Sequence, residues 1–230
     1  MGIAPTWVLR ERDAEMNRAV ENPPPPRSPG TEGMTPSLAR EARIAAMDWP
    51  ALKSAVRDCT ACGLRAGCTQ TVFGAGDQKA QWLLVGEAPG QEEDRQGEPF
   101  VGQAGKLLDA MLASIQLKRG QNVYIANVLK CRPPGNRNPA PEEVAKCSPH
   151  LLRQVALLQP KLILAMGRFA VQALLGTDAS IASLRGKLHR YAGVPLIVTY
   201  HPAYLLRTLP DKARAWQDLL LAKRTLAALD

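Results

Sequence analysis

Four short apolar segments, separated by helical patterns, constrain the fold of this chain more than any other feature. The apolar segments occupy residues 81–86, 122–128, 161–167 and 195–200. The spacing of apolar residues predicts helices over residues 102–116, 141–158, 168–175 and 211–229. Alternating strands and helices are typical of an α/β fold with a parallel sheet between helix layers. We therefore expect a three-layer α/β/α fold around a central four-stranded, mainly parallel sheet.

The first 45 residues differ from the rest of the chain in composition. Six of the 19 prolines lie between Asn22 and Ser37, and such a run lacks the apolar periodicity that a core requires. We expect a Pro-rich, disordered tail over residues 1–45 and a folded domain over residues 46–230, which begins with a short helix at residues 49–57. A docking motif for a partner is the alternative interpretation of the proline run.

The chain lacks the sequence features of a membrane or secreted protein. No apolar run approaches the roughly 18 residues that a membrane span requires. The N-terminus lacks the basic, apolar and small-residue regions of a signal peptide. We therefore expect a cytoplasmic protein without a membrane partner, and we expect it to be a monomer.

The positive charge of the chain is concentrated in its second half. The whole chain has a formal net charge of +8, whereas residues 118–230 carry seventeen basic and six acidic side chains. A basic surface suits a polyanion such as nucleic acid, because each Lys or Arg near a phosphate releases counterions. Many basic surfaces bind no particular partner, so charge alone leaves nucleic-acid binding open.

An acidic turn follows the first apolar segment. Residues 81–94 change from an apolar run into a turn with Gly86, Pro89 and Gly90, and Glu87 is the first of four carboxylates in it. Parallel α/β sheets place their ligand sites beyond the carboxyl ends of strands. The turn is therefore a candidate site, with an ordinary strand-to-helix connection as the alternative.

The five cysteines indicate a metal or redox site. Cys59 and Cys62 form a C-x-x-C motif, Cys131 and Cys147 lie far downstream, and Cys68 is left over. In a reducing cytosol, grouped cysteines are more often metal ligands than disulfides. The spacing leaves open an iron–sulfur cluster, a structural zinc site and a redox C-x-x-C motif.

Four motifs that occur in order along the chain resemble those of the family 4 uracil-DNA glycosylases. They are GEAPGQEED, GEPFVGQAGKLLD, NVLKCRPPGNRNP and TYHPAYLLR. With the cysteines, the resemblance covers about residues 59–207. It implies a uracil-DNA glycosylase-like fold and a DNA repair enzyme that flips uracil out of DNA and hydrolyses its N-glycosidic bond. It also implies a [4Fe–4S] cluster, leaves Cys68 outside the ligand set, and gives four cluster ligands, Cys59, Cys62, Cys131 and Cys147.

The resemblance also implies a uracil pocket. Asn127 matches the residue that reads uracil, since an Asn amide can accept from N3–H and donate to O4, whereas cytosine reverses both groups. Phe100 matches the ring on which the base stacks, and Glu93 matches a position near uracil C5. Gly86 and Ala88 are also expected to contact the substrate. Without the resemblance, Asn127 would be interpreted as a loop cap and Phe100 as a core residue.

The resemblance assigns three candidate catalytic residues. His201 matches a neutral hydrogen-bond donor to uracil O2, where negative charge develops as the bond breaks. Glu87 is the first candidate to position the attacking water or stabilise the sugar cation, and Asn136 is the second. The loop that carries Asn136 lacks the histidine-bearing insertion of relatives that trap DNA covalently. We therefore expect an abasic site and free uracil as products, with no lyase step.

Three basic residues are candidates for binding DNA. Arg185, Lys187 and Arg190 lie in the segment RGKLHR before the last apolar segment, where we expect them to meet backbone phosphates of single- or double-stranded uracil-containing DNA. The alternative function is a non-catalytic iron–sulfur DNA-binding protein, with an electron-transfer module as a weaker candidate. The presence of Glu87 and His201 favours the enzyme.

Overall fold

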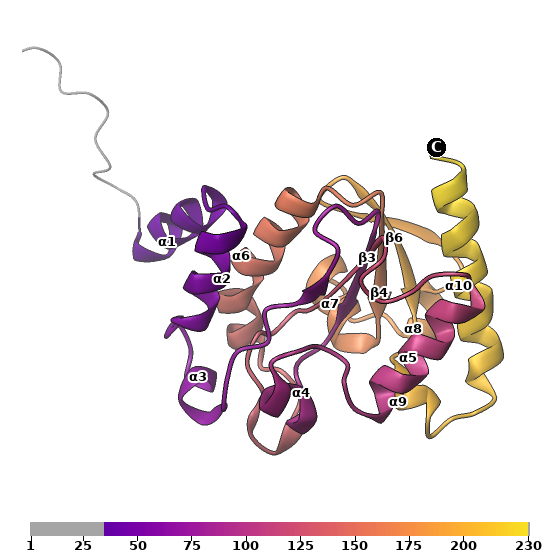
Figure 1. Cartoon of the computed structure of the whole chain (residues 1–230), viewed down its shortest axis with the longest axis horizontal. Coiled ribbons are helices and arrows are strands. Elements are labelled where there is room, and N and C mark those ends of the chain that lie inside the picture. Colours follow the sequence, from indigo (N-terminus) through magenta and orange to yellow (C-terminus); the bar gives the residue numbers. More distant parts are fainter. Residues whose placement is uncertain (1–34, 230) are drawn as a thin grey trace, which may run out of the picture. The chain divides into compact units, whose positions relative to one another are not determined.

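The computed structural model describes residues 35–229, which contain a six-stranded sheet between helices (Figure 1). The strands follow the order β1-β3-β2-β4-β6-β5 across the sheet. Their bounds are β1 Ala75–Gly76, β2 Trp82–Gly86, β3 Val123–Asn127, β4 Leu162–Met166, β5 Leu188–Tyr191 and β6 Val194–Thr199. The four predicted strands are confirmed as the central parallel strands β3, β2, β4 and β6.

The sheet has two antiparallel edge strands beyond the predicted four. Strand β1 contains only two residues, and the residues of β5 alternate between exposed and partly buried positions. Neither strand therefore carries the continuous apolar run by which the central strands are recognised in the sequence.

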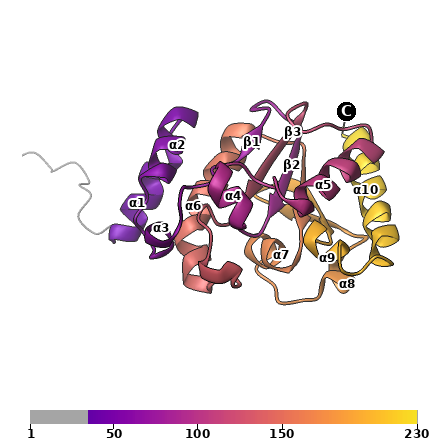
Figure 2. The same cartoon turned by 60° about the horizontal axis from the view of Figure 1, so that its bottom comes forward.

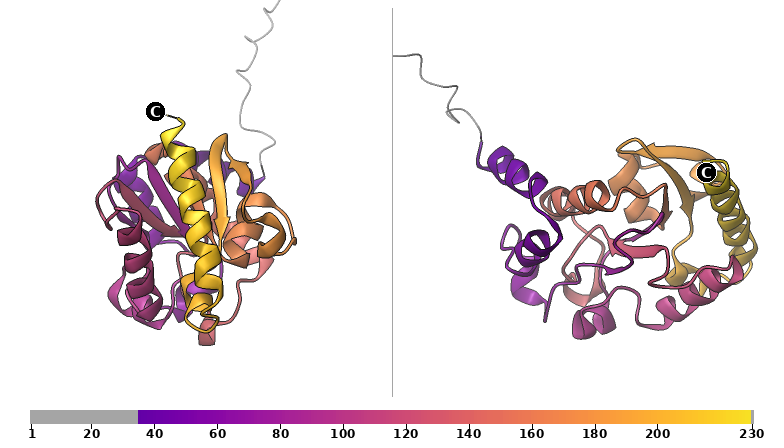
Figure 3. Two further views of the ribbon diagram at one scale, coloured as in Figure 1. Left: turned by 90° about the vertical axis from the view of Figure 1, so that its right-hand side faces the viewer. Right: turned by 45° about the horizontal axis from the view of Figure 1, so that its top comes forward.

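Helices cover both faces of the sheet, as predicted (Figures 1 and 3). In β2, Trp82 and Leu84 pack against α5 and α10, whereas Leu83 and Val85 pack against α6 and α7. This division follows from the strand geometry, because successive side chains point to opposite faces. The helix bounds are α5 Gln103–Ser114, α6 Pro141–Leu158, α7 Arg168–Leu175 and α10 Asp211–Ala227, with the short helices α3 Leu64–Gly67, α4 Gln91–Gln96, α8 Ile181–Leu184 and α9 Pro202–Leu205 between them.

Two further helices, α1 (Pro36–Ala45) and α2 (Trp49–Arg57), lie beside α6 (Figure 2). Helix α2 has the predicted bounds, but α1 occupies residues that the sequence analysis assigned to the tail. In α1, Ile44 is buried, and the Arg40 guanidinium donates to the Lys146 carbonyl in α6 at 3.0 Å. The domain therefore begins at α1, and the rest of the predicted tail, residues 1–34, lies outside the described residues. Because Ile44 is the single buried residue of α1, its composition does not distinguish it from a tail.

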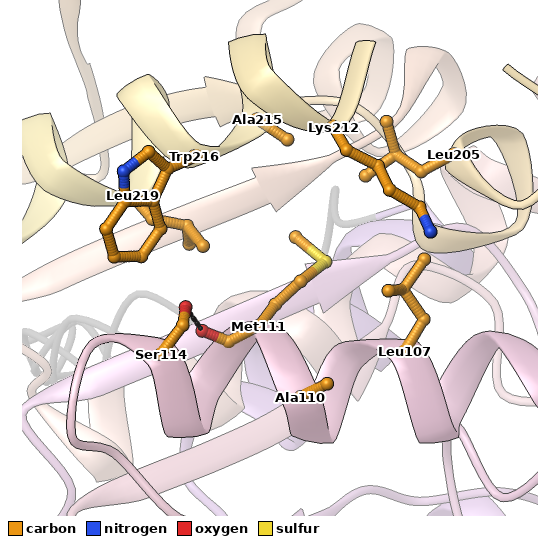
Figure 4. Close-up of a pocket in the computed structure, with 9 residues that line it drawn as sticks. All are labelled: Leu107, Ala110, Met111, Ser114, Leu205, Lys212, Ala215, Trp216 and Leu219. Carbon is orange, nitrogen blue, oxygen red and sulfur yellow. Dashed lines mark hydrogen bonds between the residues drawn. The ribbon is translucent and has the colours of Figure 1, made fainter. Parts of the chain in front are cut away.

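A small pocket lies between α5 and α10 (Figure 4). It is lined by Leu107, Ala110, Met111, Ser114, Leu205, Lys212, Ala215, Trp216 and Leu219. The Ser114 hydroxyl donates to the Met111 carbonyl in its own helix, at 2.6 Å. This pocket therefore offers mainly apolar surface and lacks a carboxylate or histidine among its described lining residues.

None of the helices within residues 35–229 is long and apolar enough to cross a bilayer.

Candidate active site

The predicted pocket residues meet at the carboxyl edge of the parallel sheet. Gly86 at the end of β2 pairs with Asn127 at the end of β3, and His201 follows the end of β6. A Cβ atom on Gly86 would lie 2.5 Å from Asn127 Oδ1 and 2.6 Å from Phe100 Cζ. Only glycine therefore allows the strand, the amide and the ring to approach this closely.

Phe100 and His201 form one wall of this site. Their ring centroids are 5.4 Å apart, and the ring planes are inclined by 30°. Phe100 is only 6% exposed, although it lies in a loop before α5. The structure thus brings together the predicted stacking residue and the predicted catalytic histidine.

Asn127 has a buried acceptor that the protein leaves without a partner. The residue is 2% exposed, and its Oδ1 atom has no hydrogen-bond partner within the described chain. Leaving such an atom unpaired costs about 1–3 kcal/mol, so unpaired buried groups are rare and call for an explanation. An Asn that capped a loop through Oδ1 would accept a backbone N–H there. The observed geometry instead leaves Oδ1 available to a donor on a ligand.

Hydrogen bonding fixes the tautomer of His201. The residue caps the N-terminus of α9, and its Nδ1 atom accepts the Ala203 N–H at 3.1 Å. Nδ1 therefore carries a lone pair, and in the neutral ring the proton is on Nε2. Burial, with a smaller contribution from the positive charge of Arg207, lowers the pKa of His201 to about 4, while the Glu93 carboxylate opposes the shift. A ring with this pKa is neutral at neutral pH, with Nε2–H as its donor.

Glu87 follows β2, and its carboxyl has a raised pKa. Burial raises the pKa of its carboxyl from the ordinary value of 4.5 to about 7. Its backbone carbonyl accepts the Leu129 N–H at 3.0 Å, which ties the turn to the segment after β3. Its carboxyl makes no hydrogen bond to any residue between 35 and 229, so both oxygens are available to water or substrate.

Glu93 has a structural task that the sequence did not indicate. Its carboxylate accepts three backbone N–H bonds, from Gly90 at 3.1 Å, Val101 at 3.0 Å and Gly102 at 3.2 Å. These bonds connect the start of α4 to the start of α5 and hold the loop that carries Phe100. The carboxylate therefore organises the pocket wall, and a position near uracil C5 stays a prediction.

The structure does not join Asn136 to the other candidate catalytic residues. Asn136 is exposed, has a positive φ of 54°, and its Oδ1 atom accepts a bond from Arg132 Nε at 2.7 Å. In the described part of the chain, no hydrogen bond links it to Glu87, Asn127 or His201. Both Glu87 and Asn136 therefore stay predictions for the residue that positions the attacking water.

The cysteines gather next to this site. Cys62, Cys68, Cys131 and Cys147 belong to one cluster with Leu64 and Leu129, and Ala88 packs against it. Cys59 is near enough to raise the pKa of Cys147, and all five thiols are free. Cys68 touches the group instead of standing apart from it, because its thiol lies against Cys131.

The chemistry of these thiols fits a cationic cluster. Burial raises the pKa of Cys147 to about 11 and raises that of Cys131 further, and neighbouring thiols add to both shifts. Bound iron would offset this cost, because it favours thiolates over thiols. In residues 35–229, no three ligand-type side chains lie close enough to chelate a single metal ion.

Lys130 lies between the cysteines and the pocket, a position that was not predicted from the sequence. Its Nζ atom donates to the Asn127 carbonyl at 2.8 Å and to Gln154 Oε1 at 2.6 Å. The side chain is fully buried, which lowers the pKa of Lys130 to about 8. A lysine inside the apolar run before Cys131 was the available signal, since a buried cation requires partners.

The three predicted DNA-binding residues have different surroundings. Arg185 forms an ion pair with Asp218 at 2.9 Å, and Asp218 is 1% exposed, so this guanidinium ties the segment to α10. Lys187 is exposed and directly precedes Leu188, which pairs with Ile197 near the carboxyl end of β6. Arg190 pairs with Pro195 near the amino end of β6, so the three residues do not lie together at the end of the sheet that carries the pocket.

The fold and the site define a protein of the uracil-DNA glycosylase superfamily, whose family model, described as "Uracil DNA glycosylase superfamily", matches residues 73–220. A type-4 uracil-DNA glycosylase from Archaeoglobus fulgidus is 47% identical over 159 residues, covering 66% of this chain and 79% of the relative. One from Thermotoga maritima is 44% identical, covering 69% and 83%, and one from Pyrobaculum aerophilum is 40% identical, covering 76% and 93%. The chain belongs to the type-4 uracil-DNA glycosylase family.

Proposed function

We propose that this protein excises uracil from DNA by hydrolysing the N-glycosidic bond, and that it leaves an abasic site and free uracil without a lyase step. The observation that carries this assignment is the buried, unpartnered Oδ1 atom of Asn127 beside Phe100 and His201. A base inside a duplex must be swung out to reach such a pocket. The relatives are named as uracil-DNA glycosylases, which are enzymes. This similarity favours catalysis over the non-catalytic DNA-binding alternative.

Asn127 reads the base in this proposal. Its Oδ1 atom accepts uracil N3–H, and its Nδ2 atom donates to uracil O4. Cytosine presents a donor where uracil has O4 and an acceptor where uracil has N3–H, so both groups of the amide would be unpaired. Phe100 supplies a ring on which the base stacks, worth about 1–3 kcal/mol.

His201 and Glu87 carry the chemical step. As the bond to C1′ breaks, negative charge builds on uracil O2 and positive charge builds on the sugar. The Nε2–H of His201 stabilises O2, and a neutral ring does this without giving up its proton. The ionised Glu87 carboxylate positions water for attack at C1′ and stabilises the sugar cation.

The substrate is uracil-containing DNA, and exposed basic residues such as Lys187 contribute phosphate contacts. We expect the protein to act as a monomer. Five free thiols suit a reducing compartment, which supports a cytoplasmic location.

A gel assay on a uracil-containing oligonucleotide tests the activity. Strand cleavage is expected only after alkali, because an abasic site is stable until base cleaves it. Matched oligonucleotides with cytosine or thymine at the same position should stay intact. Cleavage before alkali would reveal a lyase step, and intact uracil DNA would favour the non-catalytic alternative.

A [4Fe–4S] cluster on Cys59, Cys62, Cys131 and Cys147 completes the proposal. When bound, the cluster would supply a cross-link between the segment before α3, the segment after β3 and helix α6. Anaerobically purified protein should be brown, with about four irons and four sulfides per chain. Cys147→Ser is expected to lose both, whereas Cys68→Ala should keep both. Stoichiometric zinc without sulfide would contradict this assignment.

The pKa of Glu87 predicts a pH dependence of activity. If the carboxylate form acts, kcat/KM should rise with pH and reach half of its plateau near pH 7. Glu87→Gln is expected to abolish this rise, while Glu92→Gln, on the exposed side of α4, should keep it.

The same group has the opposite effect on stability. The folded state holds the Glu87 proton more tightly than the unfolded chain does, so its stabilising contribution is complete below about pH 4.5 and is lost as the pH rises to about 7. Thermal unfolding of the parent and Glu87→Gln between pH 5 and 8 measures this difference. A rise of kcat/KM that persists in Glu87→Gln would assign the titration to another group.

A further inference from the structure

Phe100 keeps its ring in the site through an uncommon backbone conformation. Its φ angle is 57°, in the left-handed region that side chains larger than glycine rarely occupy. Such conformations persist only where surrounding contacts hold them, and they cluster at functional sites. The contacts that hold Phe100 therefore determine whether its ring is in place before a base arrives.

Arg119 makes two of these contacts. Its Nη1 atom donates to the Pro99 carbonyl at 2.8 Å, and its Nη2 atom donates to the Phe100 carbonyl at 2.9 Å. The guanidinium is itself oriented by Asp109 on α5, whose Oδ1 atom accepts from Arg119 Nε at 3.0 Å. A planar guanidinium can bind two adjacent carbonyls and a carboxylate at once, which a lysine ammonium cannot do in a fixed geometry.

The other side of the same loop is held independently of Arg119. The Glu93 carboxylate accepts the N–H groups of Val101 and Gly102. A Cβ atom on Gly105 would lie 1.7 Å from the Phe100 carbonyl oxygen, so the loop fits closely over the start of α5. Arg119 thus holds the carbonyl groups of the loop in place, and Glu93 holds the N–H groups that follow them.

We propose that Arg119 is a positioning residue for base recognition, which holds Phe100 in its left-handed conformation so that the ring is preorganised to stack on the flipped base. Within residues 35–229, Arg119 makes no hydrogen bond or ion pair with Asn127 or His201, so it acts on the site through the loop that carries Phe100. The inference rests on the proposed function, because it presumes that Phe100 stacks on uracil. Stacking stabilises bound substrate and transition state alike, so loss of preorganisation raises KM and leaves kcat nearly unchanged.

A double-mutant cycle separates this role from a merely structural one. Arg119→Gln in the parent is expected to lower kcat/KM on uracil DNA about tenfold, through KM. In a Phe100→Ala background, which has no ring to position, the same change should have an effect of less than about twofold. Arg119→Lys keeps the charge and can donate to one of the two carbonyls, and it should recover part of the loss. Lys118→Gln, an exposed neighbour with the same change of charge, should match the parent.

Each alternative outcome is distinguishable. Equal effects of Arg119→Gln in both backgrounds would show that Arg119 only stabilises the fold, and this would overturn the inference. If Arg119→Gln does not fold, the cycle is run with Arg119→Lys, and equal losses in both backgrounds would again overturn it. Full activity of Phe100→Ala would remove the stacking role and the inference with it, while a parent that does not excise uracil would reject the proposed function itself.

Discussion

Replacing Asn127 with aspartate is expected to lower uracil excision by at least about a hundredfold. The substitution replaces the amide donor to uracil O4 with an acceptor, so one hydrogen bond is lost and two oxygens repel each other. Together these effects cost about 3 kcal/mol or more at the transition state. Single-turnover excision from a uracil oligonucleotide, compared between parent and variant, measures the loss.

A control substitution just before the same strand shows whether the loss of uracil excision is specific to Asn127. Asn122→Asp makes the same change of charge next to the amino end of β3, where Asn122 Oδ1 accepts the Gln81 N–H at 2.7 Å, and it should excise uracil almost as the parent does. The Asn127→Asp variant must still bind undamaged DNA and match the parent in metal content. Full uracil excision by folded Asn127→Asp would remove this residue from the pocket. It would also weaken the other motif-based assignments.

Replacing His201 with asparagine is expected to lower kcat by about 10²–10³-fold, the range found when one donor to a developing anion is removed. Asparagine is a good N-cap residue, so it can still accept the Ala203 N–H and preserve the start of α9. Its shorter side chain cannot place a donor where His201 Nε2 lies. Because this donor acts mainly in the transition state, KM should change little.

His189 provides the matched control for this substitution. It bonds to the Leu184 carbonyl at 2.8 Å, outside the pocket, and His189→Asn should keep parental kcat. The low pKa of His201 adds a second readout, because a ring that is neutral above about pH 4 contributes no titration of kcat between pH 5 and 8. Parental kcat in folded His201→Asn would show that this histidine only caps α9.

The sequence predicted the central part of the fold because buried parallel strands carry continuous apolar runs. Helix α6 was predicted with both ends correct, since Pro141 marks its first turn and the apolar spacing ends at Leu158. Strand β5 and helix α1 were not predicted, because an exposed edge strand and a polar helix lack such runs. Their formation depends on tertiary contacts that sequence periodicity does not contain.

The pocket was predictable to the level of residue types but not of contacts. Asn127 and His201 come together because parallel strands end at one edge of the sheet. The contacts of Lys130 with Gln154 and of Arg119 with Phe100 depend on groups far away in sequence. The tautomer of His201 depends on the local geometry of α9, which places the Ala203 N–H against Nδ1. The position of Arg190 was not predictable for a related reason, since β5 runs antiparallel to β6 and carries Arg190 toward the amino end of β6.

The position of Arg40 decides where the chain can be trimmed. From α1, its guanidinium reaches the Cys59 sulfur at 3.8 Å and His150 Nε2 at 3.0 Å. A shortened protein that starts at residue 46 would leave this flank of the cysteines open to water and oxygen. A shortened protein that keeps α1 retains the contacts of Arg40 with Cys59 and His150. A version for crystallisation or for handling in air should therefore start before Pro36, although the superfamily match begins only at residue 73.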